Sequence, residues 1–357
     1  MKILIGGSPC THWSIAQTKN RETEASGIGW ELFLNYRIAR DKYQPDYFLY
    51  ENNKSMSPAI RAQITVELGV EPVLINSALV SAQNRQRLYW AGKRNADGTY
   101  SKVNVEQPED RGVLLKDVLD SVVARDLTCN DKDYTLTATY DGACAQNTTG
   151  RHQRNMIAEP INVTADGKAQ CLRATCYKDG IRNIIANEVD KKTGVAEPIK
   201  AIGKDGKDGK EITFYEVNDG KITIKGKQYP IKLKDGYYII RKLTARECKR
   251  LQTVPEWYEF PVSNSQAYKM LGNGWTVDVI AHIMSHFDGL TEEPVEVLSM
   301  YDGMSCGHIA LDKLGAKITA YYAAEIDKYA VQTTQHNFPD TVQLGDAFQV
   351  RKEDWVL

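Results

Sequence analysis

Four side chains in the first ninety residues could together carry out nucleophilic chemistry. Cys10 lies in a turn rich in glycine and proline after the first apolar run, and Glu51 ends the second such run. Arg85 and Arg87 occupy alternate positions of a later polar segment. A thiol, a carboxylic acid and fixed cations are the groups needed to add to an electron-poor ring and to stabilise the resulting charge. Each has a structural alternative, since free cysteines are often buried apolar residues and the charged groups could cap a turn or face solvent, but their joint occurrence at strand ends favours chemistry.

A second group of polar residues, near the end of the chain, predicts a cofactor site. The apolar run 295–300 leads into the glycine-containing turn 301–307. Glu325 follows the next predicted strand, and Asp346 lies at the tip of the one after it. Such a turn lets a ligand approach the backbone, and an acid after the following strand can accept both hydroxyls of a ribose. We expect an adenosine-type cofactor, with Asp346 accepting from the adenine amine. This turn has neither GxGxxG nor the Lys-Ser/Thr pair that follows a phosphate-binding loop, which argues against a dinucleotide and a P-loop.

The composition is that of an ordinary globular protein. The chain has 357 residues, of which 42% are hydrophobic and 25% charged, which leaves room for two domains. It contains neither an apolar run of about 18 residues nor a leader pattern, so we expect a cytoplasmic protein. Its seven scattered cysteines show no close pair at zinc-ligand spacing, so we expect reduced thiols and no metal.

The charge is distributed unevenly along the chain. The net charge is −1, yet residues 168–250 contain 20 lysines and arginines against 11 acids, a balance of +9. One interpretation is a solvated face. The other is a module that follows nucleic-acid phosphates on an otherwise acidic protein.

The pattern of apolar residues predicts an α/β protein interrupted by a β-rich segment. Repeated strand and helix units before residue 94 indicate a mainly parallel sheet with helices on both faces. Between residues 95 and 240 the pattern changes to short strands, with hairpin turn signals at 218–220 and 234–236. A capping box at 244–247 begins a new helix. The predicted strands are 3–6, 46–52, 72–76, 83–91, 295–300, 318–323 and 342–347, and the predicted helices are 30–40, 58–68, 276–287 and one starting at 308.

Five ordered motifs resemble those of the cytosine-C5 DNA methyltransferases. The resemblance covers everything except the β-rich middle of the chain. Ser8-Pro9-Cys10 and Tyr301-Asp302-Gly303 are closer to the eukaryotic de novo enzymes than to most bacterial ones. The motifs are Gly7-Ser8-Pro9-Cys10, Glu51-Asn52-Asn53, Gln83-Asn84-Arg85-Gln86-Arg87, the helix at 241–252, and the loop Leu271-Gly272-Asn273-Gly274.

The order of these motifs departs from that of the family. The family runs from the cofactor half through the catalytic loop and the recognition domain to a closing helix, whereas here the cofactor half comes last. The resemblance therefore implies a circularly permuted, Rossmann-like S-adenosylmethionine-dependent methyltransferase sheet with an inserted β-rich target-recognition domain. A connector as short as 288–294 could join the closing helix to the first cofactor strand. The implied parts are a catalytic half at 1–94, the recognition domain at 95–240, closing helices at 241–287 and the cofactor half at 288–357.

The resemblance also implies a mechanism. The target cytosine leaves the duplex, Cys10 attacks C6, and Glu51 holds N3 and N4. Arg87, assisted by Arg85, holds O2 and fixes the acid. S-adenosyl-L-methionine then methylates C5 and becomes S-adenosyl-L-homocysteine, while residues 11–29 form a mobile loop that closes over the DNA. The residues expected to bind the cofactor are Tyr301, Asp302, Gly303, Met304, Ser305, Gly307, Glu325, Ile326, Asp346, Ala347, Pro9, Leu32, Asn273 and Gly274.

The expected partner is double-stranded DNA. We expect a monomer that acts in a bacterial or phage-infected cell and binds neither a membrane nor a metal. The recognition domain would read bases from the major groove, with its basic part on phosphates. Polar residues that could read bases, or could equally be exposed loop residues, are Arg151, His152, Gln153, Arg154 and Arg173.

Three other functions share part of this pattern. An RNA cytosine-C5 methyltransferase has the same fold and chemistry. A catalytically silent DNA-binding relative would have no use for the intact Cys10, Glu51, Arg85 and Arg87. A relative of thymidylate synthase also uses a cysteine on C6, but it has no need of a basic β-rich domain.

Overall fold

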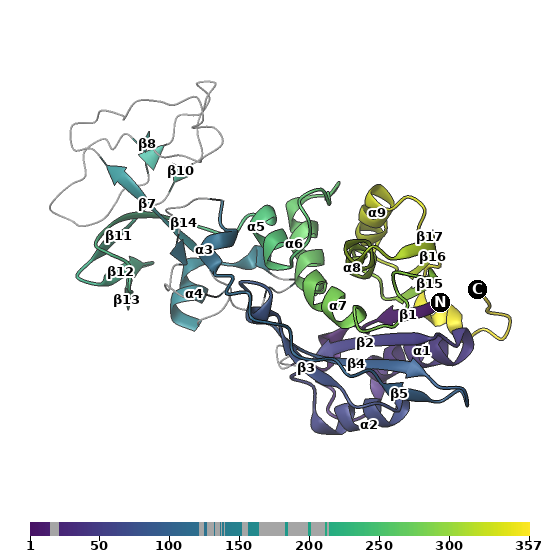
Figure 1. Ribbon diagram of the computed structural model, residues 1–357. Coiled ribbons are helices and arrows are strands. Elements are labelled where there is room, and N and C mark those ends of the chain that lie inside the picture. The colour runs from purple at the N-terminus through teal and green to yellow at the C-terminus, as the bar shows by residue number, and fades with distance from the viewer. Residues whose placement is uncertain are drawn as a thin grey trace.

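The computed structural model divides into a sheet covered by helices and a β-rich part beside it (Figure 1). It describes residues 1–14, 21–120, 125–126, 132, 136, 138, 140–151, 156–163, 183–184, 199–200, 211–212 and 214–357. Within these ranges no helix is long and apolar enough to cross a membrane.

The main sheet has the strand order β17-β16-β15-β1-β2-β4-β3, with β5 beside β4. The first five strands run parallel, and β4 runs antiparallel to β2, β3 and β5. The prediction of a mainly parallel α/β sheet is therefore confirmed. The strands are β1 (Lys2–Gly6), β2 (Tyr47–Asn53), β3 (Val73–Asn76), β4 (Gln86–Arg94), β5 (Tyr100–Lys102), β15 (Pro294–Met300), β16 (Lys317–Ala324) and β17 (Val342–Gln343).

The register brings the ends of the three central strands together. Gly6, the last residue of β1, lies opposite Met300 on one side and Tyr50 on the other. Strand β4 runs the other way, so its start meets the same edge, where Arg87 pairs with Asn53. The segments after β15, β1 and β2 and the segment before β4 thus lie along one edge of the sheet.

Helices cover both faces of this sheet, because successive strand residues point to opposite sides. In β1, Leu4 belongs to one buried cluster, whereas Ile3 and Ile5 belong to the other. Helices α1 (Gly27–Tyr43) and α2 (Pro58–Leu68) pack on the first face, and α7 (Val277–Met284), α8 (Cys306–Leu314) and α9 (Lys328–Asn337) lie on the second (Figure 1). Helix α8 approaches β1 so closely that a Cβ on Gly307 would lie 2.1 Å from Ile5 Cδ1.

The β-rich part contains a sheet of order β13-β12-β11-β14-β7-β6, with β8 beside β7. The hairpin predicted at 218–220 is confirmed, since Asp219 and Gly220 have φ angles of 50° and 64° and join β11 to β12. The elements are β6 (Arg125–Asp126), β7 (Ile157–Val163), β8 (Asn183–Ile184), β11 (Phe214–Asn218), β12 (Lys221–Ile224), β13 (Lys227–Pro230), β14 (Gly236–Arg241), a separate pair β9 (Ile199–Lys200) and β10 (Glu211–Ile212), and the helices α3 (Leu115–Val118) and α4 (Ala145–Arg151).

Several local predictions were wrong. The turn at 234–236 makes no hairpin, because Gly236 begins β14, which pairs with β11 and β7. The expected loop 271–274 is mostly the last turn of helix α6 (Asn264–Asn273). The last strand ends at Gln343, and Asp346 caps a short 3₁₀ helix, η4 (Ala347–Arg351), by accepting from the amide of Phe348. The capping box was right: Thr244 and Glu247 begin α5 (Ala245–Leu251).

Candidate active site

The turn that carries Cys10 is fixed from the neighbouring strand. After β1 the chain makes a short 3₁₀ helix, η1 (Cys10–His12). Buried Asn52 donates from Nδ2 to the carbonyl of Ser8 (3.1 Å) and to the hydroxyl of Tyr50 (3.1 Å). That hydroxyl also shares a hydrogen bond of 2.7 Å with Ser8 Oγ. Burial raises the pKa of Tyr50, so its hydroxyl stays protonated. Together these hydrogen bonds hold the backbone just before Cys10 in place.

Glu51 is held at both carboxylate oxygens. Its Oε1 pairs with Nε of Arg87 at 3.0 Å, and its Oε2 accepts from the indole N–H of Trp275 at 3.0 Å. The residue is 9% exposed. A Cβ on Gly7 would lie 2.7 Å from the Glu51 carbonyl and 3.0 Å from Oε2, so the turn before Cys10 passes directly over this acid. Sequence reasoning missed Trp275, whose only signal is its place directly after the 271–274 motif.

Arg85 has different partners from Arg87. Its buried guanidinium donates to the carbonyls of Leu136 (3.0 Å), Gly272 (3.2 Å) and Gly274 (2.9 Å). The last of these precedes Trp275. These contacts assign Arg85 to holding the segment that supports Glu51, whereas Arg87 touches the acid itself.

We predict that Arg85→Ala lowers the free energy of unfolding by about 2–3 kcal/mol, because buried carbonyls lose their donors. Arg87→Ala breaks the ion pair with Glu51, whose side chains are only 15% and 12% exposed, and should cost a similar amount, about 3 kcal/mol, because a mostly buried carboxylate loses its cation. Urea denaturation of the two variants measures both losses. Equal midpoints for Arg85→Ala and the wild type would contradict this assignment.

The turn after β15 is shaped by three residues with left-handed backbone. Tyr301, Gly303 and Ser305 have φ angles of 63°, 60° and 56°. The Tyr301 hydroxyl donates to the carbonyl of Leu32 at 2.7 Å and accepts from Nδ2 of Asn35 at 3.4 Å, both on α1. A Cβ on Gly303 would meet no atom within 4 Å, so a ligand can reach the backbone there. The turn thus has a fixed aromatic side and an open side.

Glu325 closes this turn from the next strand. Its Oε2 accepts from the amide of Gly303, and its Oε1 accepts from the amides of Ile326 and Asp327, each at 2.8 Å. These bonds orient the carboxylate, whose oxygens can still accept from hydroxyl groups. Ile326 is 75% exposed.

Two buried groups support the turn from below. Asp302 accepts from the hydroxyl of Tyr321 at 2.8 Å and from Ser305 Oγ, and burial raises its pKa. Burial also raises the pKa of Cys306 to about 12, so this thiol is not a nucleophile. Both groups are therefore structural parts of the turn.

Of the remaining residues of the expected cofactor site, Gly274 lies directly against the same turn. A Cβ on Gly274 would lie 3.2 Å from Cys306 Sγ and 3.5 Å from Met304 Sδ, which places the end of α6 against the turn. Tyr258, which the motifs did not indicate, donates to the carbonyl of Met304 at 2.7 Å. In the segment after β17, Asp346 is exposed and Ala347 is buried. Asn273 and Pro9 are exposed, whereas Gly307 is buried in α8.

Other expectations fall partly outside the described residues. Arg151 ends α4, whereas His152, Gln153, Arg154 and Arg173 lie outside the described residues. The described portions of the expected mobile loop 11–29 are tied to the protein, for example by Arg21, which donates to the carbonyls of Trp13 and Ser55. In the part of the chain that the structure describes, no three His, Cys, Asp or Glu side chains could hold a metal ion.

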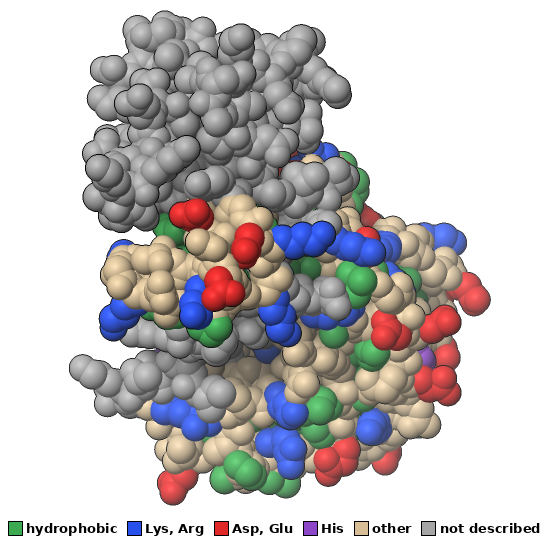
Figure 2. All heavy atoms as spheres, turned by 90° about the vertical axis from the view of Figure 1, so that its left-hand side faces the viewer, with side chains coloured by type: hydrophobic (Ala, Val, Ile, Leu, Met, Phe, Trp, Pro, Cys, Tyr) green, Lys and Arg blue, Asp and Glu red, His purple; other side chains and the backbone are tan. Residues whose placement is uncertain are grey.

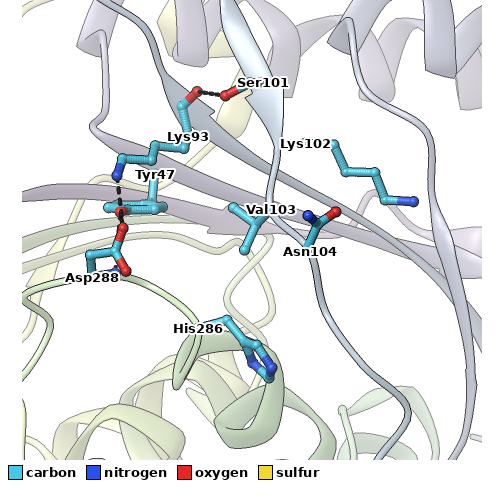
Figure 3. Close-up of a pocket in the computed structure, with 8 residues that line it drawn as sticks. All are labelled: Tyr47, Lys93, Ser101, Lys102, Val103, Asn104, His286 and Asp288. Carbon is cyan, nitrogen blue, oxygen red and sulfur yellow. Dashed lines mark hydrogen bonds and ion pairs between the residues drawn. The ribbon is translucent and has the colours of Figure 1, made fainter.

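A separate open hollow of about 390 Å³ lies at the start of β2, at the other end of this strand from Glu51 (Figure 3). Asp288 accepts there from Nζ of Lys93 (2.7 Å) and the hydroxyl of Tyr47 (3.2 Å). These bonds fasten the beginning of the connector 288–294 to β2 and β4. The hollow contains none of the expected site residues.

Comparisons with known proteins match this chain to one family. The family model described as C-5 cytosine-specific DNA methylase matches residues 1–288. The type II methyltransferase M1.ScrFI of Lactococcus lactis subsp. cremoris is 28% identical, over 83% of this chain and 62% of its own length. M.HpaII of Haemophilus parainfluenzae is 26% identical, over 78% of this chain and 69% of its own. The methyltransferase EhMeth of Entamoeba histolytica, a solved structure, is 15% identical with a TM-score of 0.39, over 81% of this chain and 78% of its own.

Proposed function

This chain belongs to the C-5 cytosine-specific DNA methylases, and we propose that it transfers a methyl group from S-adenosylmethionine to C5 of a cytosine in duplex DNA. The chain spans 62% of the length of its relative M1.ScrFI, so methyl transfer to DNA is proposed for this chain and is not taken over from that relative. One observation carries it: the turns after β15 and β1 and the end of β2 meet at one edge of the sheet. The segments that contain Cys10, Glu51 and residues 301–307 are therefore neighbours.

The side chains at this edge support the following steps. Cys10 as thiolate forms a bond to C6 of a cytosine that has left the stack. Glu51 holds N3 and N4, and Arg87 holds O2, so the electrons displaced from the ring are stabilised and C5 becomes nucleophilic. After C5 has gained the methyl group, its proton leaves to a base, the C5–C6 double bond re-forms and Cys10 departs as thiolate.

The turn 301–307 fits S-adenosylmethionine, which supplies the methyl group when bound. The open space beside Gly303 admits a ligand to the backbone. We propose that Tyr301 packs on the cofactor, that Glu325 accepts from its ribose hydroxyls, and that Asp346 accepts from its adenine amine. Exposed Ile326 lies between these two acids in the sequence and offers an apolar surface for the adenine ring.

The β-rich part supports duplex DNA as the partner. Five exposed lysines lie on the hairpin of β12 and β13 or in the segment just after it. Basic side chains also lie on the part of the protein that contains the main sheet, in the same view (Figure 2). Positive charge on both parts suits a protein that contacts phosphates around a flipped base. We propose that a monomer binds the DNA inside a bacterial or phage-infected cell. The lysines are Lys221, Lys225, Lys227, Lys232 and Lys234.

We also propose that the chain is circularly permuted relative to its family. The family model ends at residue 288, and the cofactor turn at 301–307 follows that match. Strand β15 nevertheless pairs with every residue of β1, from Lys2 opposite Glu296 to Gly6 opposite Met300. On this proposal residues 1–94, 241–287 and 288–357 build one methyltransferase domain, and residues 95–240 form the inserted recognition domain.

A transfer assay with radiolabelled S-adenosylmethionine tests the proposed function. We expect label in duplex DNA and none in tRNA. Label in tRNA alone would overturn the choice of DNA. No transfer to either nucleic acid would indicate a silent relative.

A further inference from the structure

Glu22 links three segments around the turn that carries Cys10. Its Oε2 accepts from the indole N–H of Trp13 at 3.1 Å, and its Oε1 accepts from the amide of Gly29 at 3.2 Å. The same Oε1 lies 3.6 Å from Nδ1 of His12, and the amide of Glu22 donates to the His12 carbonyl at 2.9 Å. Trp13 is fully buried. One carboxylate thus joins η1 to the first turn of α1.

Two glycines at the start of α1 lie directly against this carboxylate. A Cβ on Gly29 would lie 2.6 Å from Glu22 Oε2 and 2.7 Å from Trp13 Nε1. A Cβ on Gly27 would lie 2.6 Å from Glu22 Oε1, and Gly27 has a φ of 79°. The start of α1 is therefore glycine because the carboxylate occupies the space of a side chain.

Helix α1 connects the Glu22 carboxylate to the turn at 301–307. Gly29 in its first turn donates to Glu22, and Leu32 three residues later accepts from the hydroxyl of Tyr301. Asn35, fully buried in the next turn, donates to the same hydroxyl. The turn of Cys10 and the turn of Tyr301 are thus both fastened to the first half of one rigid helix.

We propose that Glu22 is a positioning residue that sets the place of Cys10 relative to the cofactor turn through α1. The inference rests on the proposed function and adds a residue that does not touch the reacting atoms. Reacting groups that are misplaced by about 1 Å can lose about 100-fold in rate. Loss of Glu22 should therefore slow the chemical step and leave the cofactor turn, held by Leu32 and Asn35, able to bind.

The test compares Glu22→Gln with Glu24→Gln, a change of an exposed acid in the same segment. Glutamine keeps the size of Glu22 but replaces one accepting oxygen by an amide that faces an N–H donor. We expect the single-turnover rate of methyl transfer to fall about 10- to 100-fold in Glu22→Gln. The dissociation constant for S-adenosylhomocysteine should stay within about twofold, and Glu24→Gln should match the wild type in both measurements.

Trp13→Phe provides an intermediate case, because it removes one of the donors to Glu22 and keeps an aromatic side chain. We expect its rate to fall less than that of Glu22→Gln. Hydrogen exchange of residues 21–30, measured without DNA, should be faster in Glu22→Gln because the Gly29 amide loses its acceptor. This readout needs no catalytic activity.

Two results would overturn the inference. One is an unchanged single-turnover rate in Glu22→Gln, whether or not its hydrogen exchange changes. The other is a loss that appears entirely as weaker binding of S-adenosylhomocysteine. An inactive wild type with the expected change in exchange would instead count against the proposed function, so the two failures can be told apart.

Discussion

Replacement of Cys10 by serine is expected to reduce methyl transfer by about 10³-fold or more, while the protein still folds and binds duplex DNA. A serine hydroxyl is far less acidic than a thiol, so it supplies almost no anion to attack C6. Removing a covalent nucleophile is among the largest single losses known for enzymes. The effect should fall on the chemical step, because the turn is held through Asn52 and the backbone of Ser8.

The measurement is a denaturing gel of the protein after incubation with S-adenosylmethionine and duplex DNA that contains 5-fluorocytosine. The fluorine cannot leave as the C5 proton does, so the wild type should remain covalently attached and migrate more slowly. Cys144→Ser, which changes a half-buried cysteine of the β-rich part, serves as the matched control and should still form the adduct. An adduct with Cys10→Ser would show that another residue is the nucleophile.

Glu51→Gln is expected to lower the rate of methyl transfer by about 10²- to 10⁴-fold, the range for a group that manages a proton in the transition state. Glutamine fits the same space, but one of its two terminal groups becomes a donor. It then faces either Nε of Arg87 or the indole N–H of Trp275, each 3.0 Å from Glu51 in the structure. The variant also lacks the acid that favours protonation at N3.

Single-turnover transfer to duplex DNA measures this loss, and filter binding checks that DNA affinity is retained. Glu71→Gln changes an exposed acid just before β3 and should behave as the wild type. A rate for Glu51→Gln within about threefold of the wild type would exclude the proton-managing role.

Much of the sheet could be predicted because its signals are local. Helix α2 buries Ile60, Ile64 and Leu68 at helical spacing and ends at Gly69, whose φ is 75°. The apolar runs that became β1, β2 and β15 are each followed by polar residues, which is why the site could be placed at one edge. The capping box at Thr244 and Glu247 involves only four consecutive residues.

The helices and strand pairings that could not be predicted depend on contacts between residues far apart in the sequence. Helix α9 is polar along most of its length, and Asn337 at its end bonds to the carbonyl of Glu259 and accepts from that residue's amide. Residues 234–236 have the composition of a turn, but tertiary packing decides which strands β14 pairs with. Such contacts leave no local pattern.

The candidate site shows the same division. The types of Cys10, Glu51 and the arginines indicated the chemistry, and the resemblance implied that Arg87 fixes the acid, but neither indicated the partners of Arg85. Arg85 lies one residue before β4 and bonds to carbonyls near Trp275, while Arg87 within the strand reaches Glu51. Trp275 is 224 residues from Glu51 along the chain, and its place after the 271–274 motif does not indicate that its indole bonds to this acid.

Base-resolution sequencing of plasmid DNA incubated with the protein and S-adenosylmethionine tests the central claim most directly. We predict 5-methylcytosine at one recurrent duplex sequence with the wild type and none with Cys10→Ser. This result would report the activity and the recognition sequence together. Unmethylated plasmid after incubation with a folded wild-type protein, or equal methylation by Cys10→Ser, would contradict the account.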